Sequence, residues 1–151
     1  MAKKNLLVAV DFSEASKLIV QKAAELAQQL SARIVLLHVV EPTVAPVPGE
    51  GAKGVAAAWP LKTPKRVSNL KTRLNALAKP LKAAGIEVEF AAPVGLLADE
   101  ILDLAVKCQA DYIILGSHGH PDARHLTVNH FTGMLARLTC PLIIVPGKTG
   151  T

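Results

Sequence analysis

The stretch NLLVAVDFSEASKLIVQKAAELAQQLSARIVLLHVV, residues 5–40, decides the fold class. It begins with the apolar run Asn5–Val10, which predicts a buried strand, and the polar residues that follow predict a helix start with Ser13 as its N-cap. Between residues 14 and 30 the apolar side chains recur on one helical face. Arg33–Val40 is again rich in Ile, Val and Leu, as expected of a strand covered on both faces. The stretch therefore predicts a strand, a helix and a second strand.

The same alternation continues along the chain. A helix is expected over 65–84 with Gly85 as its stop signal, and the alternating run Ile86–Ala92 predicts a strand near a sheet edge. Later elements are expected as a helix over 97–108, a strand over 112–115, a helix around 128–138 and a strand over 142–145. Since sequential parallel strands need crossover connections, the alternation predicts a doubly wound α/β fold, a five-stranded parallel sheet with helices on both faces.

Length and composition set the domain organisation. The 151 residues are enough for one domain, so residues 1–151 are read as a single unit. Residues 41–64 differ from the rest because proline and glycine punctuate them throughout. We expect this insertion to lack regular structure and to serve as a lid, a partner-binding loop or a partly disordered segment.

Composition also argues against several classes of protein. The apolar runs are far shorter than the ~20 residues that cross a bilayer, and no secretory signal follows Lys3 and Lys4, so no membrane association and a cytoplasmic location are expected. The net charge is +5, but aromatic residues make up only 3% of the chain, which argues against nucleic-acid binding. The basic run 62–82 is accordingly read as a solvated helix face. Cys108 and Cys140 form no CxxC pair and are expected to be reduced packing residues.

Three segments together resemble one known family. They are Leu7–Ser13, the stretch from Val94-Gly95 through Glu100-Ile101-Leu102 to Ala110-Asp111, and the turn Gly116-Ser117-His118-Gly119 followed later by Cys140-Pro141. In this order and spacing they resemble the universal stress protein family over nearly the whole chain. The resemblance implies the strand order 3-2-1-4-5, a homodimer paired through the last strand, and a role in stress survival. An exposed last strand also needs its edge covered, which pairing with a twin would achieve.

Many members of that family bind ATP through a GxxG turn after the fourth strand, followed after nine residues by Gly and then Ser or Thr. Such glycines let the backbone approach ribose and phosphate, and a helix N-terminus attracts the outer phosphates. The resemblance implies a nucleotide site made of Asp11 for ribose or metal, the Val39 backbone for adenine, Leu115, Gly116 and Gly119 for ribose and α-phosphate, and Asn129, His130 and Phe131 for the outer phosphates.

The second half of that pattern is altered in this chain. Asn129 and His130 stand where the pattern has Gly and Ser or Thr, so a side chain occupies space that the phosphates would need. His130 can still donate a hydrogen bond to phosphate, and Asn129 is an acceptable helix cap. We therefore expect a degraded ATP pocket that acts as a ligand-dependent switch.

The sequence contains no recognisable catalytic set, which favours a stress protein that is not an enzyme. Ser13, Ser16 and Ser117 lack the GxSxG setting of a nucleophile, and paired carboxylates do not follow the strands. One alternative is an interaction module of the same fold that binds a protein partner without nucleotide. A less favoured alternative is a metal-binding variant that uses the histidine-rich loop His118, His120, Asp122, His125 and His130. No HExxH occurs, so no metal site is assigned.

Overall fold

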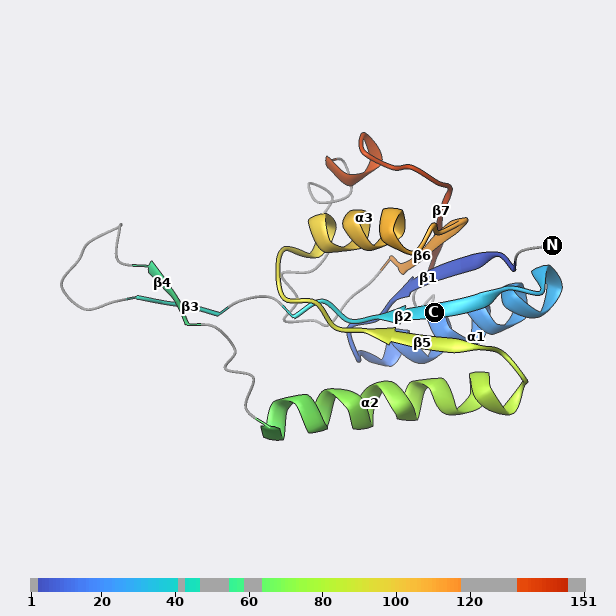
Figure 1. Ribbon diagram of the computed structural model, residues 1–151, viewed down its shortest axis with the longest axis horizontal. Helices are drawn as coiled ribbons and strands as arrows, with labels where there is room; N and C mark the ends of the chain where they lie inside the picture. Colours follow the sequence, from blue (N-terminus) through green and yellow to red (C-terminus); the bar gives the residue numbers. More distant parts are fainter. Residues whose placement is uncertain (1–2, 41–42, 47–54, 59–63, 118–132, 147–151) are drawn as a thin grey trace, which may run out of the picture.

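The computed structural model describes residues 3–40, 43–46, 55–58, 64–117 and 133–146. Its elements, in chain order, are β1 (Asn5–Ala9), α1 (Glu14–Leu30), β2 (Arg33–Leu37), β3 (Thr43–Pro46), β4 (Val55–Ala58), α2 (Pro64–Ala83), β5 (Val88–Ala91), α3 (Leu97–Lys107), β6 (Tyr112–Gly116) and β7 (Leu142–Val145). Figure 1 shows them along the chain from blue to red.

The main sheet has five strands in the order β5-β2-β1-β6-β7, and every pair in it is parallel. Counting these strands in chain order gives 3-2-1-4-5, so the predicted fold class and strand order are confirmed. The strand order reverses on either side of β1. The carboxyl ends of β1, β2 and β6 therefore meet at one edge of the sheet, where doubly wound folds bind their ligands.

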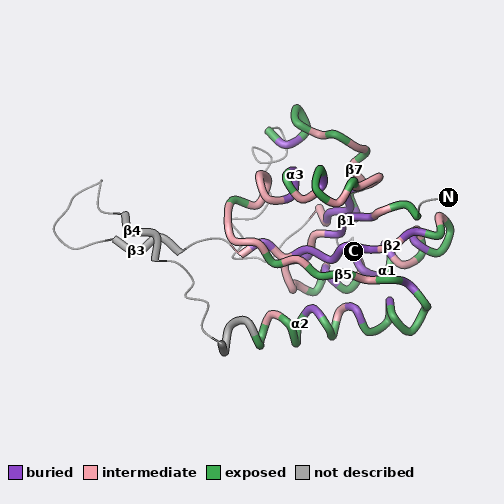
Figure 2. The backbone as a smooth tube through the Cα atoms, in the orientation of Figure 1, coloured by how far each residue is buried: buried purple, intermediate pink, exposed green. Residues whose placement is uncertain are grey.

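Alternating side chains of the strands build two apolar layers, one on each face of the sheet. Leu6, Val8 and Ile34 pack with α1 and α2, whereas Leu7 and Val35 pack with α3 on the opposite face. Figure 1 shows α3 on one side of the sheet and α1 and α2 on the other, and in Figure 2 the central strands carry most of the buried colour. Burial on both faces explains why β1 and β2 read as continuous apolar runs.

Turn chemistry ends α2 where the sequence indicates. Gly85 has φ of +80°, a backbone conformation that glycine adopts without a steric penalty, and its N–H donates to the Lys82 carbonyl at 3.0 Å. The helix passes through Pro80 and continues to Ala83. β5, which follows, lies at the sheet edge as its alternating pattern predicts.

The insertion differs from its prediction. Residues 41–64 are expected to lack regular structure, yet β3 and β4 pair in antiparallel register from Thr43 opposite Ala58 to Pro46 opposite Val55. Figure 1 shows this hairpin projecting away from the main sheet. The prediction was wrong here because three consecutive alanines form most of β4, and alanine is depleted in strands.

The helix expected around 128–138 lies partly outside the described residues. Of the described residues in that range, 133–135 are helical. Met134 is fully buried in the layer of α3 and Leu138 packs against that layer, whereas Leu135 is 54% exposed. Within the ranges given above, no helix combines the length and the apolar character that crossing a bilayer requires.

Candidate functional site

The edge where the strand order reverses brings together three of the predicted site residues. β1 and β2 pair up to Ala9 opposite Leu37, so continuing that register places Asp11 level with Val39. β1 and β6 pair up to Val8 opposite Ile114, which places Gly116 level with Val10. The predicted ribose, adenine and phosphate contacts thus come from three adjacent strands.

Asp11 organises the turn between β1 and α1. Its Oδ1 accepts hydrogen bonds from the Ser13 N–H at 2.9 Å and from the fully buried Ser16 hydroxyl at 3.1 Å. Ser13 is the N-cap as predicted, but its own side chain makes no capping bond. The carboxylate of Asp11 thus ties the end of β1 to the start of α1 through Ser13 and Ser16.

The backbone N–H and C=O groups of Val39 are not bonded to β1 in the described structure. The Val10 N–H donates to the Leu37 carbonyl at 2.8 Å, and a regular parallel ladder would next join the Val39 N–H to the Val10 carbonyl. In the described structure neither the N–H nor the C=O of Val39 makes a hydrogen bond. The neighbouring Val40 is held from the other side, by its N–H to the Pro93 carbonyl at 2.8 Å.

A stack of three side chains stands beside this opening. The Nδ1 atom of His38 lies 3.0 Å from the Val10 carbonyl oxygen, and the His38 ring lies 4.4 Å from the Phe12 ring, centroid to centroid. The guanidinium carbon of Arg73, from α2, lies 4.4 Å from the Phe12 centroid. Such a cation over an aromatic face is attractive. Phe12 itself has φ of 64°, which is rare for a bulky residue.

The sequence pattern alone predicts no role for His38, Phe12 or Arg73. One signal was present, because His38 is the only polar residue between Ile34 and Val40. A polar group inside a buried strand needs a hydrogen-bond partner, which the Val10 carbonyl supplies.

The fourth core strand supplies two further predicted residues. The Leu115 side chain is fully buried, so only its backbone can face the strand edge. Gly116 pairs with Val145, and the Ser117 N–H donates to the Val145 carbonyl at 2.9 Å. The remaining predicted site residues, Gly119, Asn129, His130 and Phe131, lie outside the described residues, as does the histidine-rich loop. Among the described residues no group of three potential metal ligands comes together.

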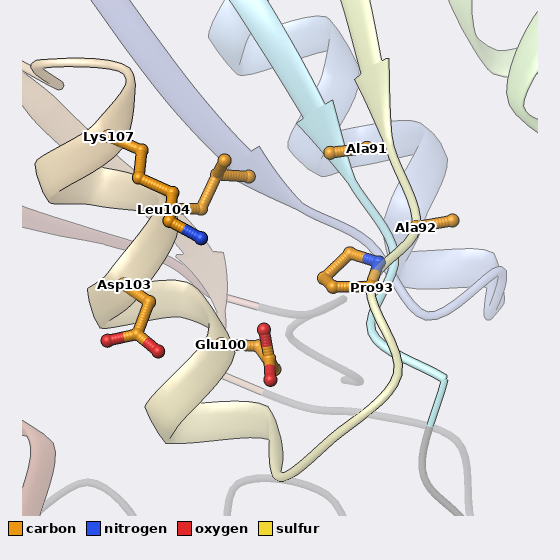
Figure 3. A pocket seen from close by; sticks show the side chains of 7 residues that line it. All are labelled: Ala91, Ala92, Pro93, Glu100, Asp103, Leu104 and Lys107. Atoms are coloured by element: carbon orange, nitrogen blue, oxygen red, sulfur yellow. The ribbon is translucent and has the colours of Figure 1, made fainter.

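A hollow of about 320 Å³ lies outside this edge, between β5 and α3. Figure 3 shows Glu100 and Lys107, on α3, reaching towards the chain that leaves β5 through Ala92 and Pro93, with the Asp103 carboxylate turned away from it. The Glu100 carboxylate packs tightly over Gly95, since a Cβ atom built there would lie 2.3 Å from its Oε1. This close approach places Gly95 directly beside Glu100 at the start of α3.

The two cysteines are free thiols at the edge of the layer formed with α3. Burial raises the pKa of the Cys108 thiol, and burial followed by the charge of Cys108 raises the pKa of Cys140. A raised pKa keeps a thiol protonated to higher pH, and the thiolate is the reactive form.

We therefore expect both thiols to react slowly in the folded chain at mildly alkaline pH. Alkylation by iodoacetamide should be about tenfold slower, or more, than in concentrated urea. Because the folded pKa values are the higher ones, the stabilisation from these thiols is present below their ordinary pKa and declines as the pH rises through the folded values. The Cys108→Ser and Cys140→Ser variants assign the two rates, and equal rates in the folded and unfolded chain would contradict the expectation.

Comparison with known proteins settles the family. The family model described as "Universal stress protein family" matches residues 3–146. This chain belongs to the universal stress protein family. Among curated universal stress proteins, it is 26% identical to universal stress protein A homolog 1 of Coxiella burnetii over 145 residues, which is 96% of this chain and 97% of that protein.

Solved universal stress proteins share the fold. UspA from Lactobacillus plantarum has a TM-score of 0.73 at 19% identity and covers 96% of this chain and 99% of its own. A universal stress protein from Archaeoglobus fulgidus in complex with dAMP has a TM-score of 0.65 at 20% identity, covering 95% of this chain and 98% of its own. Another, in complex with cAMP, has a TM-score of 0.66 at 18% identity, covering 98% of this chain and all of its own.

Proposed function

We propose that this universal stress protein binds an adenosine monophosphate group at the carboxyl edge of β1, β2 and β6, as a dimeric cytoplasmic switch and not as an enzyme. Adenine would lie against the Val39 backbone, ribose beside Asp11, and the α-phosphate beside Gly116. The proposal keeps the adenosine half of the predicted ATP site and treats the triphosphate half as degraded.

The proposal rests on the backbone N–H and C=O groups of Val39. Val39 is only 8% exposed, yet its N–H and C=O make no hydrogen bond within the described structure. Buried backbone groups almost always have a partner, so a ligand that offers both an acceptor and a donor would satisfy this position. Adenine offers this pair on one edge, with N1 as acceptor and the N6 amino group as donor.

The complexes of relatives support the same ligand class. The Archaeoglobus fulgidus protein was solved with dAMP and another family member with cAMP. Both ligands contain adenine and one phosphate, which matches the half of the predicted site that the proposal keeps.

Calorimetric titration tests the proposal. We expect AMP to bind in the low-micromolar range, corresponding to about −8 kcal/mol. GMP should bind at least about tenfold more weakly, because guanine presents a donor at N1 and an acceptor at O6 to the same peptide group. If neither nucleotide binds, the proposal fails and the nucleotide-independent interaction module becomes the better reading.

The altered phosphate pattern gives a separate prediction. AMP and ATP should bind with similar affinity, because Asn129 and His130 stand where the family pattern has Gly and Ser or Thr. Restoring that pattern with the double variant Asn129→Gly/His130→Ser should strengthen ATP binding about tenfold, with little change for AMP, since a small residue and a hydroxyl would readmit the outer phosphates. The single variant His130→Ala is the control. An equal gain for AMP and ATP would contradict the assignment of these positions to the outer phosphates.

The arrangement at the strand edge favours binding over hydrolysis. Asp11 is the carboxylate at the end of β1, and its Oδ1 already accepts bonds from Ser13 and Ser16. A general base for water needs an available acceptor of suitable pKa. Purified protein should therefore leave ATP intact, as followed by phosphate release, and robust turnover would contradict the proposal.

The dimer part of the proposal rests on β7. This strand lies at the sheet edge, and its Ile144 is 46% exposed. A hollow of about 360 Å³ beside it is lined by apolar residues such as Leu18, Leu26 and Ile143, and also by the polar Lys22, Glu25 and Gln29. An edge strand with apolar side chains is prone to pair with another strand, and a second copy of the chain offers an identical one.

A further inference from the structure

We propose that His38 is a positioning residue. Its imidazole donates a hydrogen bond to the Val10 carbonyl and thereby keeps the Val39 N–H available to the bound base. The inference rests on the proposed nucleotide site and adds a residue to it. His38 would not touch the base itself, because its side chain lies on the face of α1 and α2, opposite to that of Val39.

One hydrogen bond of the ladder between β1 and β2 is missing. The ladder runs regularly up to the bond from the Val10 N–H to the Leu37 carbonyl. The next rung of a parallel pair would run from the Val39 N–H to the Val10 carbonyl. The structure places His38 Nδ1 at that carbonyl oxygen, 3.0 Å away, and the strand pairing ends at Ala9 and Leu37.

In the bond between His38 and Val10, the imidazole is the donor. A carbonyl oxygen can only accept, so Nδ1 must carry the proton and donate it. Protonation of the ring adds a proton at Nε2 and leaves the Nδ1 donor in place. The bond therefore persists in both charge states of the imidazole.

The His38 ring is held in place. Phe12 contacts the His38 ring at a centroid distance of 4.4 Å with 39° between the planes, and Arg73 covers Phe12 at 4.4 Å. Phe12 reaches this position through its left-handed backbone, which bulky residues rarely adopt. Rare conformations of this kind persist where the surrounding contacts over-determine them. The stack thus fixes the imidazole between β1 and β2.

Two variants test the inference. His38→Ala removes the donor and leaves room for the strands to close, whereas His38→Asn keeps an amide N–H near the position of Nδ1. In the ligand-free protein we expect the Val39 amide to exchange its hydrogen about tenfold more slowly, or more, in His38→Ala than in the wild type, because the Val39 N–H then bonds to the Val10 carbonyl. AMP affinity should fall about tenfold in His38→Ala and stay within about threefold in His38→Asn.

The outcomes separate this inference from the proposed function. Unchanged Val39 exchange together with unchanged AMP affinity in His38→Ala would overturn the inference, while AMP binding by the wild type would still support the function. Slower Val39 exchange in His38→Ala, in a chain whose wild type binds no AMP, would support the role of His38 and refute the nucleotide site. If His38→Ala fails to fold, His38→Gln takes its place, since its longer side chain carries the amide away from the Nδ1 position.

Discussion

Replacing Val39 with proline is expected to abolish AMP binding, with a loss of affinity of about a hundredfold or more, while the chain still folds. Proline removes the one N–H that the base would use and places its ring carbons where the base would lie. The cost to folding should be small, because this N–H makes no hydrogen bond within the described structure. Calorimetry measures the affinity, and urea unfolding measures the stability.

Two neighbouring substitutions serve as controls for Val39→Pro. Val39→Ala keeps the N–H, so AMP affinity should stay within about threefold of the wild type. Val40→Pro removes the N–H that donates to the Pro93 carbonyl at 2.8 Å, so it should destabilise the fold, by about 3 kcal/mol. If Val39→Pro bound AMP as the wild type does, the backbone of Val39 would have no part in recognition.

The second large effect is expected at β7, the edge strand of the sheet. Ile144→Lys should convert the proposed dimer to a monomer and raise its dissociation constant about a hundredfold or more, because pairing would bring like charges together and remove them from water. Sedimentation velocity at micromolar concentration measures the change.

A matched control tests whether position, and not added charge, is responsible. Val106 on α3 is 60% exposed, more than Ile144, and lies on a helix that does not form the β7 edge. Val106→Lys should therefore leave the dimer intact. A wild-type chain that sediments as a monomer at these concentrations would refute pairing through β7.

Much of the fold could be predicted because the core strands are covered on both faces. Runs such as Asn5–Val10 then consist almost entirely of apolar residues, and the helices between them show a clear apolar face. The hairpin could not be predicted, because β4 contains residues with low strand propensity, and Pro46 ends β3. The pairing of β3 with β4 leaves no periodic pattern in the sequence.

The residues of the candidate site also fall into predictable and unpredictable groups. Asp11, Val39 and Gly116 could be expected at one edge because each lies at or just after the carboxyl end of a predicted parallel strand. The roles of His38 and Phe12 could not, since a bond from a ring nitrogen to a backbone carbonyl and a left-handed phenylalanine both depend on the packed structure.

The early end of the pairing between β1 and β2 has a consequence for mechanics. Beyond Leu37 the backbone N–H groups of His38 and Val40 donate to the β5 side, and the contact with β1 is made by the His38 ring at the Val10 carbonyl. In the proposed complex, a nucleotide bonded to Val39 and lying beside Asp11 and Gly116 would link the end of β2 to the ends of β1 and β6.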